Sequence, residues 1–290
     1  MRALAAMVLI SVSAVLGASG SGSVALTAIE EPPIDAGDAT APRLDGFHRA
    51  RLAGLAPQTR AEEALQLAVN RVDGAARYVI GHAQQWRGQF ASSERLTALI
   101  TVGINSPRIE VRMATFEIHL AQYELARSPE AVDALLERYL EDPEGAGPWA
   151  LWSIGVIGAR GVDRARVFDE LRLAASHPSE RVRRWAVDGL GKLGGVVVIE
   201  PLLEIAAVDP SPIVRERAFC ALAHGATLHV AQRYAALPGL LIIAEDAQAL
   251  DDTRTWAFQA LREISGLEAL PDDAWIWRER LLAFDLIEAP

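Results

Sequence analysis

The segment DPSPIVRERA at residues 209–218 carries the pattern on which this chain is built. Two other segments follow the same plan, SPRIEVRMAT at 106–115 and HPSERVRRWA at 177–186. In each, a valine lies four residues after a proline and is followed directly by an arginine. A small residue lies four residues after the valine. A phrase that recurs at intervals of a few tens of residues indicates a stacked-repeat protein.

Two degenerate copies extend the series. WALWSIG at 149–155 aligns with WAVDGLG at 185–191, and TRTWA at 253–257 aligns with VRRWA at 182–186. The small residues of the five copies are then 35, 36, 32 and 39 residues apart, at Thr115, Ala150, Ala186, Ala218 and Ala257. This period predicts helix pairs in which the phrase opens the second helix.

The expected helices follow from apolar periodicity. First helices are predicted near 93–104, 129–141, 163–176, 196–207 and 230–246, and second helices near 107–125, 146–158, 179–193, 211–224 and 252–265. Pro107 and Pro212 are expected in a first helical turn, where a missing N–H is tolerated. Pro238 is expected to kink the last first helix.

At these residues the chain resembles the HEAT family, especially the short HEAT-like repeats of phycobilisome lyases. The best copy has the family spacing at Asp209, Val214, Arg215, Ala218 and Leu222. The resemblance covers residues 92–266 and implies an all-α, right-handed α-solenoid of five helix pairs between helical caps. It implies a non-catalytic scaffold for an unidentified protein partner; the alternative is an accessory subunit or a lyase-like enzyme.

The N-terminus predicts export. Arg2, the uncharged apolar run after it and the small residues up to Gly20 have the layout of a signal peptide over residues 1–20. The run is shorter than the ~20 residues of a spanning helix, so no integral membrane span is expected after cleavage. An uncleaved N-terminal anchor is the alternative. We expect a periplasmic or secreted monomer.

Three more segments are assigned from composition and periodicity. Residues 21–57 include a stretch with proline, glycine and acidic residues, and predict a flexible linker. Residues 58–91 have helical periodicity without the phrase and predict an N-terminal cap. Residues 267–290 predict a closing helix, with Asp272 and Asp273 at its N-cap.

Residues at one repeat position form a column along a solenoid. One column consists of the arginines that follow the repeat valine. The resemblance implies that they pair with acidic residues of the turns, as Asp209 would with Arg215. Recognition of a ligand carboxylate is the alternative. The tryptophans are expected to pack between repeats, the alternatives being exposure toward a protein partner or a carbohydrate. These columns are Arg112, Arg183, Arg215 and Arg254, and Trp149, Trp185 and Trp256.

The position six residues after the repeat valine is the candidate partner-binding stripe. Family geometry would turn this position toward the inner curve of the solenoid, and its residues mix polar and aromatic character. An ordinary solvated helix face is the alternative. The candidates are Glu117, Trp152, Asp188 and Gln259.

Composition narrows the function classes. A formal charge of −10 argues against nucleic acid as a partner. The sole cysteine, Cys220, permits no disulfide within the chain and is expected to act as a small hydrophobic residue. No nucleophile elbow, P-loop, dinucleotide fingerprint or zinc motif is present, so neither catalysis nor a cofactor or metal is predicted.

Overall fold

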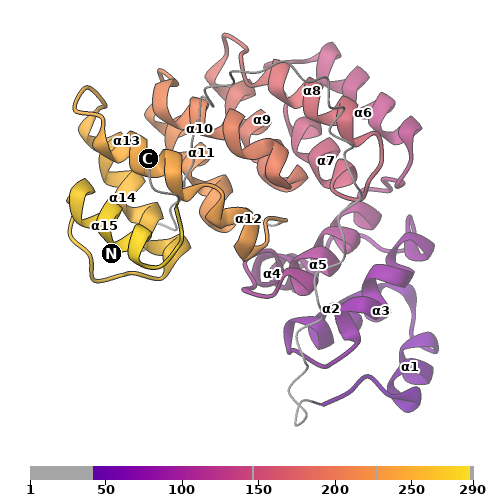
Figure 1. The fold of residues 1–290 in the computed structure, drawn as a ribbon. Helices are drawn as coiled ribbons and strands as arrows, with labels where there is room; N and C mark the ends of the chain where they lie inside the picture. Colours follow the sequence, from indigo (N-terminus) through magenta and orange to yellow (C-terminus); the bar gives the residue numbers. More distant parts are fainter. Residues whose placement is uncertain (1–41, 146, 226, 288–290) are drawn as a thin grey trace, which may run out of the picture. The chain divides into compact units, whose positions relative to one another are not determined.

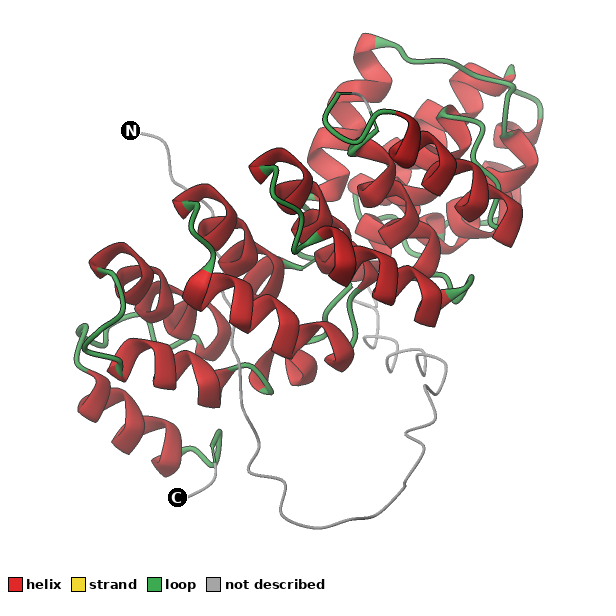
Figure 2. Ribbon diagram, turned by 90° about the horizontal axis from the view of Figure 1, so that it is seen from above, coloured by secondary structure: helices red, strands yellow, loops and turns green. Residues whose placement is uncertain are grey.

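The computed structural model describes residues 42–145, 147–225 and 227–287. The predicted signal peptide and most of the predicted linker lie outside these residues. The described part of the chain is helical and has no strand, as Figure 2 shows. None of its helices is both long enough and apolar enough to cross a membrane.

The described residues divide into two compact units, 42–131 and 132–287, which we call the N-terminal and C-terminal units. The N-terminal unit contains α1 (Gly46–Ala53), α2 (Pro57–Val69), α3 (Ala75–His82), the short 3₁₀ helix η1 (Ala83–Trp86), α4 (Glu94–Ile104) and α5 (Ile109–Gln122). α2 and α3 pack against each other and against α5, and α4 packs on α2 and α5 (Figure 1).

Helix α1 corrects the predicted boundary of the linker. Residues 46–53 are helical, although the linker was expected to continue to residue 57. The carboxylate of Asp45 accepts the N–H of His48 and caps the helix, and Leu44 and Leu52 are buried in the core. The helix forms because the N-cap and the burial of two leucines stabilise it, although the proline and glycine residues upstream are typical of a linker.

The C-terminal unit contains the rest of the helices. They are α6 (Pro129–Glu141), which begins before the boundary, α7 (Trp149–Gly158), α8 (Arg164–Ala174), α9 (Glu180–Leu193), η2 (Val196–Val198), α10 (Ile199–Val208), α11 (Pro212–His224), α12 (Val230–Tyr234), α13 (Leu237–Glu245), α14 (Asp251–Ser265) and α15 (Ala274–Ala283). Helices α7, α9, α11 and α14 pack in series, and α8, α10 and α13 each pack on the helix that follows in the pair (Figure 1).

Of the three prolines assigned to helices from the sequence, one lies where it was predicted and two do not. Pro212 lies in the first turn of α11, as expected, and the hydroxyl of Ser211 accepts the N–H of Val214. Pro107 instead precedes α5, because Arg108 is extended and forms the N-cap. The predicted kink at Pro238 is a break between α12 and α13, with Pro238 in the first turn of α13, where it costs no hydrogen bond.

Small residues set the spacing of the second helices. A Cβ atom on Gly155 would lie 2.2 Å from the carbonyl oxygen of Gly189, so α7 and α9 approach backbone to backbone. At the corresponding place between α9 and α11, a Cβ on Gly191 would lie 2.9 Å from the Cβ of Ala221. The helices therefore pack most closely where glycine faces glycine.

Candidate functional site

The repeat valines and small residues form the core beneath any surface site. Val111, Val182 and Val214 are buried, and so are the five small residues of the phrase, Thr115, Ala150, Ala186, Ala218 and Ala257. In α5 the Thr115 hydroxyl donates to the carbonyl of Val111, which satisfies its polar atom in the core. The face of each second helix that carries the valine and the small residue is therefore part of the core. A binding site would have to lie on another face of these helices.

The arginine column makes buried hydrogen bonds. Arg183 donates from Nε and Nη2 to the two carboxylate oxygens of Asp209, at 2.8 and 3.0 Å. These hydrogen bonds raise the pKa of Arg183. Asp209 lies in the turn before α11, so this bidentate pair joins one repeat to the next.

Arg215 forms the equivalent pair at the next junction between repeats. Its Nη2 atom donates to both oxygens of Asp252, at 3.1 and 2.9 Å, and its Nε to the hydroxyl of Thr253. The predicted pairing of Arg215 with the side chain of Asp209 is wrong. Arg215 binds the Asp209 carbonyl at 2.9 Å, while the carboxylate belongs to Arg183 of the preceding repeat.

The same guanidinium groups also cap their own turns. Arg112 donates to the carbonyl of Ser106 and Arg183 to that of His177, each six residues earlier, as Arg215 does to Asp209. Arg254 donates to the carbonyl of Ala244. Since these donors are directed at backbone carbonyls of the chain itself, the arginine column serves the fold.

The tryptophan column is half-buried at Trp149, Trp185 and Trp256. The ring of Trp256 meets Phe219 edge to face at 5.9 Å, and the guanidinium of Arg215 lies 5.9 Å from its centroid. One side of this ring thus packs within the repeats. Arg217 takes the column position in α11 and is exposed.

The predicted partner-binding stripe divides into two buried and two half-buried residues. Glu117 has no exposed surface and lies 3.5 Å from Nε of Arg127, and Trp152 is only 9 % exposed. Neither side chain lies open to solvent, because α5 is mostly buried and α7 is buried along its length after Trp149. A substitution at Trp152 would therefore disturb folding first.

Asp188 and Gln259 are half-buried and keep part of their surface accessible. Arg217 donates from Nη1 to both oxygens of Asp188, at 2.8 and 2.9 Å, so the tryptophan-column position of one repeat contacts the stripe position of the repeat before it. Burial raises the pKa of Asp188, while the charge of Arg217 opposes the shift. Cys220 lies at the same stripe position in α11, and burial raises the pKa of its thiol to about 12, as a hydrophobic role requires.

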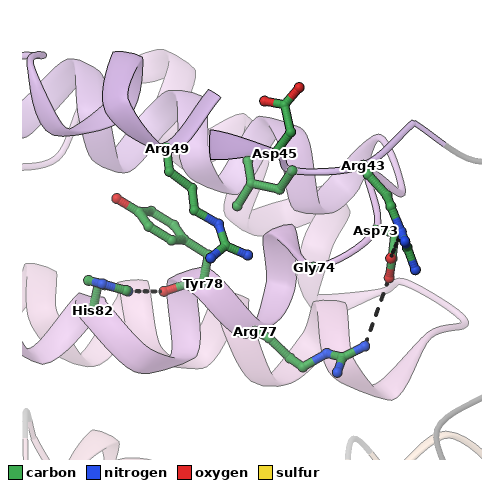
Figure 3. Close-up of a pocket in the computed structure, with 9 residues that line it drawn as sticks. Arg43, Asp45, Arg49, Asp73, Gly74, Arg77, Tyr78 and His82 are labelled. Atoms are coloured by element: carbon green, nitrogen blue, oxygen red, sulfur yellow. Dashed lines mark hydrogen bonds and ion pairs between the residues drawn. The ribbon is translucent and has the colours of Figure 1, made fainter. Parts of the chain in front are cut away.

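A second candidate lies in the N-terminal unit and was missed by the sequence prediction. A cavity of about 590 Å³ opens beside α1 and α3 (Figure 3) and is lined by Arg43, Arg49, Asp73, Arg77, Tyr78 and His82, among others. We call it the Arg49 pocket. Its residues lie outside the repeat phrase, and only a correct prediction of α1 would have brought Arg49 next to α3.

Within the described ranges, no group of three or more histidine, cysteine, aspartate or glutamate side chains is arranged to hold a metal ion. Glu245, the last residue of α13, pairs with Arg278, and Asp252, in the first turn of α14, pairs with Arg215.

The geometry of stacked pairs agrees with the comparison to known families. Residues 148–223 match the HEAT repeats family model. The match runs from the start of α7 to the end of α11 and includes the Arg183–Asp209 pair. No curated protein matches the chain. HEAT repeats generally mediate protein–protein interaction, and the Arg49 pocket lies outside the matched residues.

Proposed function

We propose that the chain is a non-catalytic scaffold whose HEAT repeats bind a protein partner along an open face of α9, α11 and α14. The residues of this face, which we call the second-helix row, are Trp185, Asp188, Arg217, Trp256 and Gln259. The observation that carries the proposal is the match of residues 148–223 to HEAT repeats, combined with the accessible side chains on the second helices of that stack.

The composition of the second-helix row suits recognition. Tryptophan and arginine are the residues most enriched among interface hot spots. Arg217 is exposed, whereas Asp188 is mostly buried beside it, so the guanidinium of Arg217 is the charge that a partner can reach. The arginine column beneath is occupied by turn carbonyls and aspartates and holds the row in place.

The finer architecture belongs to the same proposal. We infer a right-handed solenoid of five helix pairs between two caps, with repeats of the phycobilisome lyase type, and a monomeric protein. Serial packing of α7, α9, α11 and α14 supports the stacked part of this inference.

Export to the periplasm or the medium is proposed from the N-terminal sequence alone. The mature chain should begin near Ser21, after the small residues that end at Gly20. Intact-mass measurement on protein purified from its native host tests this; a mass that includes Met1 would contradict it.

A charge reversal tests the binding face. Arg217→Glu should reduce partner recovery at least tenfold in affinity capture quantified by mass spectrometry, because it reverses the exposed charge that the partner would contact. Arg172→Glu is the matched control, since Arg172 is an exposed arginine on the first helix α8. Equal recovery by the two variants, or the same loss from both, would refute the second-helix row as the binding face.

A further inference from the structure

The charges around the Arg49 pocket are unequally matched. Asp73 accepts from Nε of Arg43 at 3.0 Å and lies 3.8 Å from a guanidinium nitrogen of Arg77. One carboxylate is thus shared by two guanidinium groups. Since the closer contact comes from Arg43, Arg77 holds Asp73 only loosely and retains donors for another acceptor.

The other carboxylate at the rim is already engaged. Asp45 accepts the N–H of His48 at 2.9 Å and contacts the His48 ring at 2.7 Å. Its hydrogen bonds with the backbone and side chain of His48 lower its pKa, so it stays ionised. In Figure 3 the carboxylate is directed away from Arg49 and Tyr78.

Arg49 supplies the unmatched charge. Its side chain extends from α1 toward α3, beside the ring of Tyr78 (Figure 3). No hydrogen bond or ion pair within the described residues engages it. In a chain with a formal charge of −10, three guanidinium groups around one cavity form a local basic site.

An aromatic wall completes the pocket. The ring of Tyr78 stacks on that of His82, with centroids 4.2 Å apart and an interplanar angle of 26°. Nδ1 of His82 lies 2.7 Å from the Tyr78 carbonyl, and Trp86 lies 6.0 Å from the Tyr78 ring. His82 thus holds the Tyr78 ring in place, and Arg49 lies beside that ring (Figure 3).

We propose that the Arg49 pocket binds a small organic carboxylate, with its anionic group on Arg49 and Arg77 and its flat body against Tyr78. Guanidinium groups bind carboxylates through paired N–H donors. An aromatic body gains further contact with Tyr78 by stacking. The cavity volume of about 590 Å³ is within the range of small-molecule sites.

Calorimetric titration of the full chain at low salt tests the proposal with three probes: benzoate, acetate and inorganic phosphate. Benzoate should bind more tightly than acetate by about fivefold, the equivalent of one aromatic contact. Tighter binding of phosphate than of benzoate, or no binding of benzoate, would overturn the proposal. Equal affinities for benzoate and acetate would overturn the role of Tyr78.

Two variants and one control locate the site. Arg49→Gln should weaken benzoate binding about tenfold or more, because it removes a charge-assisted hydrogen bond. It should leave the melting temperature unchanged, since Arg49 is exposed. Tyr78→Leu should remove the preference for benzoate over acetate. Arg87→Gln, at an exposed arginine outside the pocket, should bind like wild type; the same loss in Arg87→Gln as in Arg49→Gln would show nonspecific charge attraction.

Discussion

The junction between α7 and α9 and the junction between α9 and α11 use opposite means to hold neighbouring repeats. At the first, Gly155 and Gly189 bring two backbones together without intervening side chains. At the second, the backbones are spaced by Ala221, and Arg183 reaches across to Asp209 with two hydrogen bonds. The same phrase therefore supports either close backbone contact or a buried ion pair.

The difference follows from which residues each copy of the phrase has kept. The copy that forms α7 has Gly147 where the others have arginine, and the turn before α9 has His177 where the turn before α11 has Asp209. Both partners of the ion pair are absent from the first junction, and both are present in the second. A lone arginine or aspartate would leave a buried charge unmatched, so the two positions are expected to change together.

Breaking the ion-paired junction should have the largest effect. Asp209→Ala leaves the buried Arg183 without its carboxylate, and loss of one partner of a buried pair costs about 3–5 kcal/mol. Urea unfolding measures the loss. Asp133→Ala is the control, because it breaks the exposed pair with Arg166 and should unfold at the wild-type urea concentration. Equal midpoints for the two variants would show that the buried pair adds nothing.

Filling the glycine junction should cost somewhat less. Gly155→Ala places a Cβ 2.2 Å from the Gly189 carbonyl, and separating α7 from α9 to relieve the overlap should cost about 3 kcal/mol in the same unfolding assay. Gly81→Ala is matched to it, because Gly81 is also helical and has open space around its Cβ position. That variant should gain about 0.5–1 kcal/mol from helix propensity. A gain in both would disprove the tight contact.

Truncation on α9, the helix common to both junctions, should have an intermediate effect. Trp185 is half-buried, so Trp185→Ala should cost about 2 kcal/mol, below the 3–5 kcal/mol of a fully buried ring. Thermal unfolding checks this. A loss above about 3 kcal/mol would assign the ring wholly to the repeat contact and remove it from the second-helix row.

The smallest effect concerns the reactivity of Cys220 on α11. With a pKa of about 12, about one thiol in ten thousand is ionised at pH 8, so modification by a disulfide reagent should be slow. Asp209→Ala should accelerate it by loosening α11, whereas Gly155→Ala acts at the other junction and should change it little. An equal increase of the modification rate in both variants would show that loosening one junction also loosens the other.

The repeat phrase predicted the helices well because its signals are local. The predicted second helix 179–193 differs from α9 by one residue, and the predicted first helix 129–141 coincides with α6. Apolar periodicity and an N-terminal cap need only neighbouring residues, so single-sequence reasoning detects them.

The pairing of charges was not predictable in the same way. Arg215 has Asp209 six residues before it, yet the carboxylate of Asp209 binds Arg183, 26 residues earlier in the sequence. Which arginine binds the Asp209 carboxylate depends on how far one repeat is displaced along the next. The spacing of residues within one repeat does not predict that displacement. The burial of Glu117 and Trp152 was missed for the same reason, since it depends on neighbouring elements.

Helix α7 also has a consequence for synthesis of the chain. Its ten residues, Trp149–Gly158, carry no charge and are almost wholly buried in the folded chain. Exposure of this segment to water is therefore unfavourable until the helices that bury it have been synthesised. Helix α9 is complete only at Leu193, which is 35 residues later. At about 5–20 residues per second the ribosome needs about 2–7 s to supply it. During that interval the nascent chain presents an uncovered aromatic and aliphatic segment, the kind that holdase chaperones bind.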